Sequence, residues 1–345
     1  MIMKHISNRL FLWTYALFAA ALIAVMLLCI CAGSVPIPLG DTVTALVNSL
    51  LGREVPAGIS KAIILNVRLP RVVNVALVGA ALSLCGAAMQ GLLRNPLADG
   101  STLGVSSGAS LGAVIALALN ISLPGLPFGG TTVMAMLFAF LSLIIILSAS
   151  YALDRTLSTN SIILMGVIFS MFASSLINLI ISFAPENAKS VTFWTMGSLA
   201  GTNFSHARML ALMLLVCGGV LLRCHRELNA FAMGENNARH IGVNVKKIKL
   251  VILLCVSALT GVCVSVAGAI GFVGLVVPHM TRMLVGPNHK RLLPAALFSG
   301  AIFLLLADLV ARTIVSPVEL SIGVVTSLVG AAAFVLIFYR TRKGR

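Results

Sequence analysis

The 345-residue sequence has little charge: Asp, Glu, Lys and Arg make up 10% of it, whereas 59% of the residues are hydrophobic. A soluble chain could not cover so much apolar surface with so few charged side chains. Aromatic residues are also scarce, at 6%, while the 30 glycines suit helices that pack closely on one another. The composition therefore predicts an all-α membrane protein, a polytopic bundle without a soluble domain of its own.

Several motifs of catalysis and metal binding are absent. The dipeptide Gly-Lys never occurs, so the chain has no P-loop for ATP. None of the seven cysteines has zinc-ligand spacing, so we expect free thiols and no metal site. Within the predicted spans Asp308 is the only acid, fewer ionisable groups than a proton-coupled pump usually needs. The chain is thus expected to bind no cofactor, and a membrane enzyme is disfavoured.

Ten apolar segments are candidates to cross the membrane, since a hydrocarbon core of about 30 Å needs roughly 20 helical residues. Residues 1–345 are read as one membrane domain, and the even number of spans puts both termini on the same side. The shortest segment is interrupted by Pro278. The spans are expected near residues 11–33, 71–93, 102–120, 131–152, 159–183, 206–223, 247–267, 271–285, 293–314 and 320–340.

The net charge of +15 reflects the topology of the chain more simply than an affinity for nucleic acid. Most Lys and Arg residues lie in the short segments between apolar runs. With a cytoplasmic N-terminus, seventeen basic residues fall on the cytoplasmic side and seven on the outer side. The positive-inside rule therefore places both termini in the cytoplasm, and no nucleic-acid partner is expected.

Two arginines, Arg68 and Arg71, stand on the outer side at the start of the second predicted span. Cations at a helix N-terminus oppose the helix dipole, at a cost of about 0.3–1 kcal/mol. An acidic partner outside the membrane would explain them, and anchoring to lipid headgroups is the alternative. Arg312 follows Asp308 by four residues, so an ion pair on one helix face is expected, which still allows Arg312 to face outward.

The stretch RNPLADGSTLGVSSGASLGA, residues 94–113, joins the second and third predicted spans. Pro96 ends the second span. Gly104, Gly108 and Gly112 recur every four residues, so they share one helix face and let another backbone approach closely. The residues predict a stiff turn at the inner face beside a close-packed helix, and by themselves they do not establish a gate.

Residues 224–246 form a long segment on the predicted cytoplasmic side. They read as two short helices hinged at Gly234. Charges of both signs alternate there with the apolar Leu228, Phe231 and Met233. A segment of mixed polarity is a plausible docking surface for a cytoplasmic protein, and a solvated basic loop is the alternative.

Seven sequence motifs occur together and in order: RLPR, GAALSLCGAAMQGLLRNPLADGSTLGVSSGAS, LNAFAMGENNARHIGVNV, GFVGLVVPHMTRMLVG, HKRLLP, LLLADLVAR and VELSIGVVTSLVGA. With them the chain resembles, over nearly its whole length, the FecCD family of permease subunits. These are the transmembrane halves of ABC importers for iron-siderophores, haem and cobalamin.

The resemblance implies ten spans per subunit in the bacterial cytoplasmic (inner) membrane. It also implies a second permease subunit, which is a homodimer partner or a sister chain, and two cytoplasmic ABC ATPase subunits that bind ATP and magnesium. A periplasmic or lipid-anchored binding protein would deliver the cargo. The chain itself would be no enzyme. A stand-alone secondary transporter is the alternative, and it would need an ion-coupling site.

The resemblance also implies roles for particular residues. In a cobalamin-transporting member of the family, arginines matching Arg68, Arg71 and Arg312 face glutamates of the binding protein. The inner gate maps onto Asn95, Pro96 and Leu97. The helices that couple to the ATPase match the segment from Glu227 to Gly242, in which the candidate residues are Glu227, Leu228, Phe231, Met233, Gly234, Arg239 and Gly242.

Overall fold

The computed structural model describes residues 8–33, 38–51, 62–121, 123, 129–155 and 158–343, and within these ranges it contains helices and no strands. The all-α architecture is thus confirmed. The elements are α1 (Asn8–Cys31), α2 (Leu39–Leu50), η1 (Ile63–Arg68), α4 (Leu69–Leu93), η2 (Gly100–Leu103), α5 (Val105–Ala118), α6 (Gly129–Leu153), α7 (Thr159–Phe183), η3 (Pro185–Asn187), α8 (Ala188–Thr195), α9 (Phe204–Met213), η4 (Leu214–Gly218), α10 (Gly219–Arg223), α11 (His225–Ala232), α12 (Glu235–His240), α13 (Val245–Ala267), α14 (Val273–Val285), α15 (His289–Thr313) and α16 (Ile322–Lys343).

Seven helical stretches in the described residues are long and apolar enough to cross a membrane. They are Trp13–Cys31, Ile63–Leu93, Gly129–Leu153, Thr159–Phe183, Phe204–Arg223, Val245–Ala267 and His289–Thr313. The other three predicted spans correspond to the shorter apolar helices Val105–Ala118, Val273–Val285 and Ile322–Leu336. A multi-pass bundle fits these lengths, and the crossing of the membrane by all ten segments stays a prediction.

The second span is longer than the sequence suggested, because its helix does not begin beside Pro70. A π-helical turn over Ile63–Arg68 runs directly into α4, so the continuous helix spans Ile63–Leu93. A proline has no backbone N–H to donate, and the wider turn before it accommodates this loss within the helix. Pro70 therefore follows an irregular turn within a longer helix, at the place where we expected the helix to start.

Helix α4 forms the centre of the bundle and is almost entirely buried. It packs against α15, α14 and α13, which belong to the C-terminal half of the chain. Gly79 of α4 faces the backbone of Gly300 in α15, and Gly86 faces Gly274 in α14, so closely that a Cβ atom would overlap the opposing carbonyl. Small residues at these crossings allow the backbones to touch, which is how helices in membranes pack tightly.

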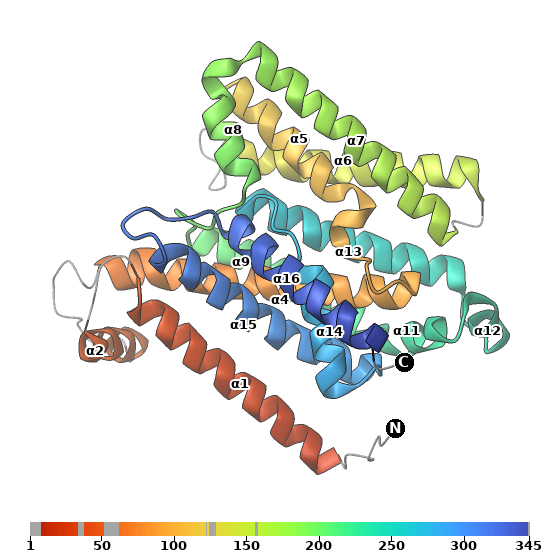
Figure 1. Cartoon of the computed structure of the whole chain (residues 1–345), viewed down its shortest axis with the longest axis horizontal. Coiled ribbons are helices and arrows are strands. Elements are labelled where there is room, and N and C mark those ends of the chain that lie inside the picture. The colour runs from red at the N-terminus through yellow and green to blue at the C-terminus, as the bar shows by residue number, and fades with distance from the viewer. Residues whose placement is uncertain are drawn as a thin grey trace.

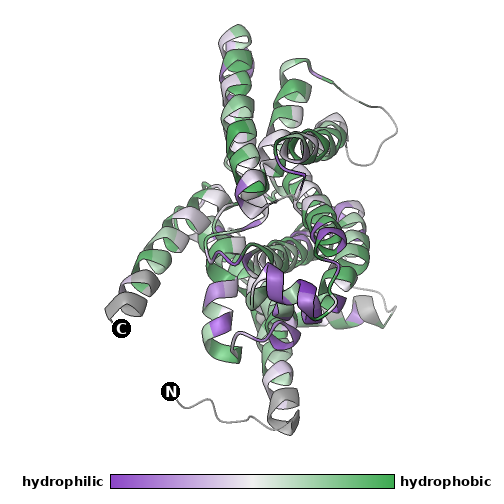
Figure 2. Cartoon of the chain, turned by 90° about the vertical axis from the view of Figure 1, so that its right-hand side faces the viewer, coloured by the Kyte–Doolittle hydropathy of each residue, from purple (hydrophilic) through white to green (hydrophobic). Residues whose placement is uncertain are grey.

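The ends of the bundle differ in character. The beginning of α1, the end of α16 and the short helices α11 and α12 all lie at one end, and α2 lies at the other (Figure 1). Figure 2 looks onto the end that carries α11 and α12, where hydrophilic residues gather in front of long hydrophobic helices. The assignment of this end to the cytoplasm stays a prediction from the distribution of basic residues.

Residues 224–246 fold as two short helices, as the sequence predicts. Helix α11 ends at Ala232, and α12 begins at Glu235. Gly234 joins them with a φ of 113°, a backbone conformation that other residues rarely adopt. The direction of α12 relative to α11 therefore depends on this glycine.

Candidate functional site

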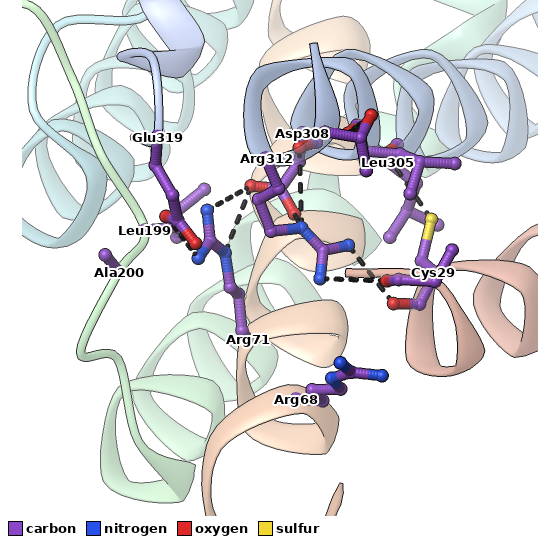
Figure 3. Close-up of polar contacts among 12 residues, drawn as sticks. Cys29, Arg68, Arg71, Leu199, Ala200, Leu305, Asp308, Arg312 and Glu319 are labelled. Carbon is purple, nitrogen blue, oxygen red and sulfur yellow. Dashed lines mark hydrogen bonds and ion pairs between the residues drawn. The ribbon is translucent and has the colours of Figure 1, made fainter. Parts of the chain in front are cut away.

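Four charged side chains meet at the α2 end of the bundle (Figure 3). Arg71 of α4 donates from Nη2 and Nε to Oδ1 of Asp308 in α15, at 2.9 and 3.1 Å, and from Nη1 to Oε2 of Glu319 at 2.8 Å. Nε of Arg312 forms an ion pair with Oδ2 of Asp308 at 3.0 Å. The same Nε donates a hydrogen bond to the backbone carbonyl of Asp308 at 3.4 Å. Asp308 is fully buried between the two arginines.

The same cluster receives the carboxyl end of α1. Arg312 Nη2 donates to the carbonyl of Cys29 at 3.1 Å. Arg68 Nη1 donates to the carbonyls of Ile30 and Cys31, both at 2.8 Å. The last carbonyls of a helix have no partner within the helix and carry its negative dipole end, so cations are favourable there. Arg68, which lies toward the N-terminal end of its own helix, and Arg312, which lies in the last turn of α15, thus both stabilise the end of α1.

This arrangement changes the interpretation of the three outer arginines. We expected cations presented to an acidic partner, but Arg68, Arg71 and Arg312 expose only 5, 9 and 3% of their surface. The predicted contact between Asp308 and Arg312 is present. The sequence missed the other bonds because their partners lie in helices far away in the chain. A docking role for the arginines stays a proposal.

At the opposite end, the turn after α4 is held by its own residues. Arg94 adopts a left-handed conformation with a φ of 52°, which ends the helix. The Oδ1 of Asn95 accepts the backbone N–H of Leu97 at 2.9 Å, and the Asn95 carbonyl accepts that of Ala98 at 3.1 Å. Pro96 and Leu97 are exposed. An Asx turn next to a proline is stiff, as expected for a candidate gate.

The third predicted span begins later than expected, because Gly104, with a φ of 77°, precedes α5 as its N-cap. Gly104 packs against Gly166 of α7, whereas Gly108 and Gly112 face α6. A Cβ at Gly108 would collide with Ser142, and one at Gly112 with the carbonyl of Met134. The three glycines therefore pack against two neighbouring helices, α6 and α7. The close packing of α5 on both helices requires that these positions lack side chains.

The candidate coupling residues separate into two groups by exposure. Leu228 and Phe231 are fully buried against the rest of the chain, although we expected them to face the ATPase. An amphipathic helix that lies on its own bundle turns its large apolar side chains inward. Met233 is 59% exposed, and Ile241, which was not among the predicted residues, is 61% exposed. The exposed apolar surface of this segment therefore lies at Met233 and Ile241.

Side chains also tie α11 to the neighbouring long helices. The Oδ1 of Asn229 accepts the backbone N–H of His289 at 2.9 Å, and its Nδ2 donates to Oδ1 of Asn288 at 3.0 Å. Helix α11 contacts α4 as well as α15. The Arg94 guanidinium lies beside Gly234, so the end of α4 reaches the hinge between α11 and α12. The structure thus brings the candidate gate turn and the candidate coupling segment together.

A buried ion pair connects α12 to α13. Nζ of Lys249, whose side chain is fully buried, lies 2.6 Å from Oε1 of Glu235, which is 30% exposed. We expect Lys249→Met to lower the free energy of unfolding by about 1–3 kcal/mol, because the half-buried carboxylate loses its cation. Unfolding in mixed micelles would measure the loss. Lys247→Met, at an exposed position in the same helix, is the control and is expected to change little.

Within the described residues, no three His, Cys, Asp or Glu side chains are grouped as metal ligands. All seven cysteines are free thiols. At the α2 end of the bundle, the two positive charges of Arg71 and Arg312 are balanced by the two negative charges of Asp308 and Glu319, so these four residues form a structural clamp.

Comparison with protein-family models identifies the chain over residues 21–340, which match the model described as the FecCD transport family. The chain belongs to the FecCD family. The resemblance seen in its motifs is thereby confirmed. Members of this family are permease components of ABC transporters and are not themselves enzymes.

Three curated relatives illustrate the range of the FecCD family. The chain is 47% identical to the uncharacterized ABC transporter permease protein YvrB of Bacillus subtilis, over 82% of this chain and 80% of that protein. It is 36% identical to the molybdate import system permease protein MolB of Haemophilus influenzae, over 83% of both. It is 37% identical to the hemin transport system permease protein HmuU of Yersinia pestis, over 81% of this chain and 84% of that protein.

A solved structure of the same architecture is an inward-facing conformation of a putative metal-chelate type ABC transporter. It superposes on this FecCD chain with a TM-score of 0.78 at 30% sequence identity, and covers 93% of this chain and 97% of that one. The fold of the described bundle is therefore that of an ABC permease.

Proposed function

We propose that this chain is the permease subunit of an ABC importer that moves an iron-siderophore, haem or cobalamin across the cytoplasmic membrane. The observation that carries the proposal is the pair α11–α12, which is fixed to the bundle by Leu228 and Phe231 and leaves Met233 and Ile241 exposed. Such a segment suits docking to a cytoplasmic subunit, because it is anchored on one side and apolar on the other. Membership in a family of ABC permeases supports this assignment.

The proposed assembly holds two permease subunits, two cytoplasmic ATPase subunits and an outer binding protein. The absence of a P-loop in the sequence agrees with ATP binding by the partner. The three relatives described above bear the names of permease proteins of an ABC transporter, a molybdate import system and a hemin transport system, and such names fit an assembly in which another subunit binds ATP. A homodimer of this chain is the simplest pairing of the permease subunits.

The contacts of the coupling segment suggest how movement passes to the membrane helices. Asn229 fixes α11 to the start of α15, and Glu235 fixes α12 to α13. The turn at Asn95–Leu97 lies beside the hinge at Gly234 through Arg94. Closure of the ATPase would therefore displace helix ends as rigid bodies and move this turn, since packed helices do not deform continuously.

We retain Arg68, Arg71 and Arg312 as residues that dock the binding protein. The exchange of carboxylates at Arg71 would bring the binding protein into contact with their cluster. Glu319 is 34% exposed, whereas Asp308 is fully buried. A carboxylate of the binding protein can reach Arg71 by taking the place of Glu319. The cluster would then exchange an internal carboxylate for an external one, at little electrostatic cost.

A stand-alone secondary transporter finds less support in this geometry. Such a protein needs an ionisable group that can gain and lose its ion within the membrane. In the described spans the acid is Asp308, and it lies between Arg71 and Arg312. Its two carboxylate oxygens already contact these two guanidinium groups, so the carboxylate is a poor ion-coupling site.

Reconstitution in proteoliposomes tests the proposed function. We expect cargo uptake when this chain is combined with its ATPase, its binding protein and ATP, and no uptake by the chain alone under a proton or sodium gradient. Radiolabelled ferric siderophore, haemin, cyanocobalamin and molybdate are the probes. Gradient-driven uptake by the purified chain without any ATPase would refute the importer assignment.

A further inference from the structure

A small polar cavity lies between α5, α7 and the end of α8. Its volume is about 290 Å³. No charged side chain lines it. Besides Ile177 and Ala269, its lining consists of hydroxyl and amide side chains, namely Ser106, Ser107, Ser110, Ser174, Asn178 and Thr195. We call these six residues the hydroxyl pocket.

The hydroxyls of this pocket differ from others on the same helix. In α7, Ser170, Ser175 and Ser182 each donate back to a carbonyl four residues earlier, at 2.8, 3.0 and 2.9 Å. Ser174 has no such bond, and neither its hydroxyl nor the Asn178 amide bonds to another side chain or carbonyl in the described part of the chain. Serine in an apolar helix usually satisfies its hydroxyl by this local bond. The Thr195 hydroxyl donates to the carbonyl of Thr192 at 2.9 Å, whereas Ser174 and Asn178 present to the pocket hydrogen-bonding groups that their own helix leaves unused.

The three serines of α5 behave in the same way. Ser106, Ser107 and Ser110 form no side-chain hydrogen bond within the described ranges. Ser110 is nevertheless buried. Unpaired hydroxyl and amide groups are costly against lipid chains. This face of the bundle is thus suited to water or to a polar ligand, and poorly suited to the hydrocarbon of the bilayer.

The backbone around the pocket is irregular, which also indicates that the pocket holds water or a polar ligand. Helix α8 ends at Thr195, and Gly197 follows with a φ of 76°. The next residue, Ser198, donates its N–H to the carbonyl of Ala267 at 2.8 Å, beside the break between α13 and α14. Irregular backbone at membrane depth is tolerated where it is covered by protein or lines a water-filled cavity.

We propose that the hydroxyl pocket binds a neutral part of the cargo that bears amide, hydroxamate or other carbonyl oxygens, during its passage through the permease. This inference rests on the proposed import function. Serine hydroxyls and a carboxamide donate and accept hydrogen bonds equally, so they suit neutral polar groups. A carboxylate would be desolvated there without a compensating cation. The volume of about 290 Å³ is at the lower limit of ordinary small-molecule sites, so the pocket would hold one edge of a large cargo.

The test is uptake by the complete transporter in proteoliposomes, with the binding protein and ATP present. The neutral probes are a ferric trihydroxamate siderophore and cyanocobalamin, and the carboxylate-bearing probes are haemin and ferric dicitrate. In the variant Ser174→Ala/Asn178→Leu we expect uptake of the transported neutral probe to fall about tenfold, the effect of two lost hydrogen bonds. ATP hydrolysis is expected to stay within about twofold of the unaltered transporter, because the ATPase contacts lie at the far end of the bundle.

Matched variants separate hydrogen bonding from packing. Ser175→Ala/Ser182→Ala removes two hydroxyls from the same helix that already bond to it, and is expected to retain uptake. Ser174→Thr keeps a hydroxyl and is also expected to retain it. Loss in either of these variants would show that helix packing, or contact with a second copy of the chain, explains the result, and would overturn the proposal.

The remaining outcomes are equally decisive. Unchanged uptake of the neutral probe in Ser174→Ala/Asn178→Leu overturns the pocket and leaves the import function standing. Transport of the carboxylate-bearing probes alone by the unaltered chain overturns the assigned ligand class. If the unaltered complex shows no ATP-dependent uptake of any probe, the proposed function fails, and the inference that depends on it fails too.

Discussion

Replacing Asp308 by leucine is expected to lower the free energy of unfolding by about 3–5 kcal/mol, because two buried guanidinium groups lose their shared carboxylate. Arg71 lies 2.9 Å from one carboxylate oxygen and Arg312 lies 3.0 Å from the other. Asp308 is fully buried, so water cannot replace it. The loss would be measured as a shift in the denaturant midpoint of the purified chain in mixed micelles.

Two further variants test whether the loss of stability comes from buried charges that are left without a partner. Glu319→Gln removes the half-exposed partner of Arg71 and is expected to cost less than about 1 kcal/mol, because solvent screens an exposed pair. Replacing Arg71, Asp308 and Arg312 together by apolar residues is expected to recover much of the stability, since no charge is then left unpaired. If Asp308→Leu unfolds at the same midpoint as the unaltered chain, the cluster does not hold α4 and α15 together.

The second large effect is expected at the coupling segment, where Met233→Asp/Ile241→Asp should reduce ATPase binding at least about tenfold. Both side chains are more than half exposed on a segment that is otherwise polar on its outer side. Exposed apolar residues that become buried in an interface supply much of its binding energy, and a charge there remains desolvated. Co-purification of the ATPase and cargo-stimulated ATP hydrolysis would measure the effect, while the folded state of the permease should not change.

Leu228→Asp and Phe231→Asp provide the contrast. Both residues are fully buried within the chain, so a carboxylate there should detach α11 from the bundle and lower the melting temperature of the isolated permease. Full ATPase stimulation in Met233→Asp/Ile241→Asp would place the contact elsewhere on the segment. A normal melting temperature in Phe231→Asp would contradict the packing of α11.

Features that depend on residues close together in the chain could be predicted from the sequence. The two short helices around Gly234 and the contact between Asp308 and Arg312 were predicted, because each depends on residues within one or two helical turns. The burial of Leu228 and Phe231 against the bundle was not predicted, since the apolar face of α11 had two candidate partners, the bundle and the ATPase. The hydroxyl pocket was not predicted at all, because Ser110, Ser174 and Thr195 come from three separate helices.

The sequence by itself determined the class of this protein: an apolar, glycine-rich, P-loop-free helical chain of the FecCD family. These properties follow from composition, from runs of apolar residues and from motifs that are contiguous in the chain. The tertiary structure decided which partner each polar group meets. It assigned Arg68 to the end of α1, Arg71 to Asp308 and Glu319, and Lys249 to Glu235. Such choices depend on how helices pack across long separations in sequence, and hydropathy contains no information about that packing.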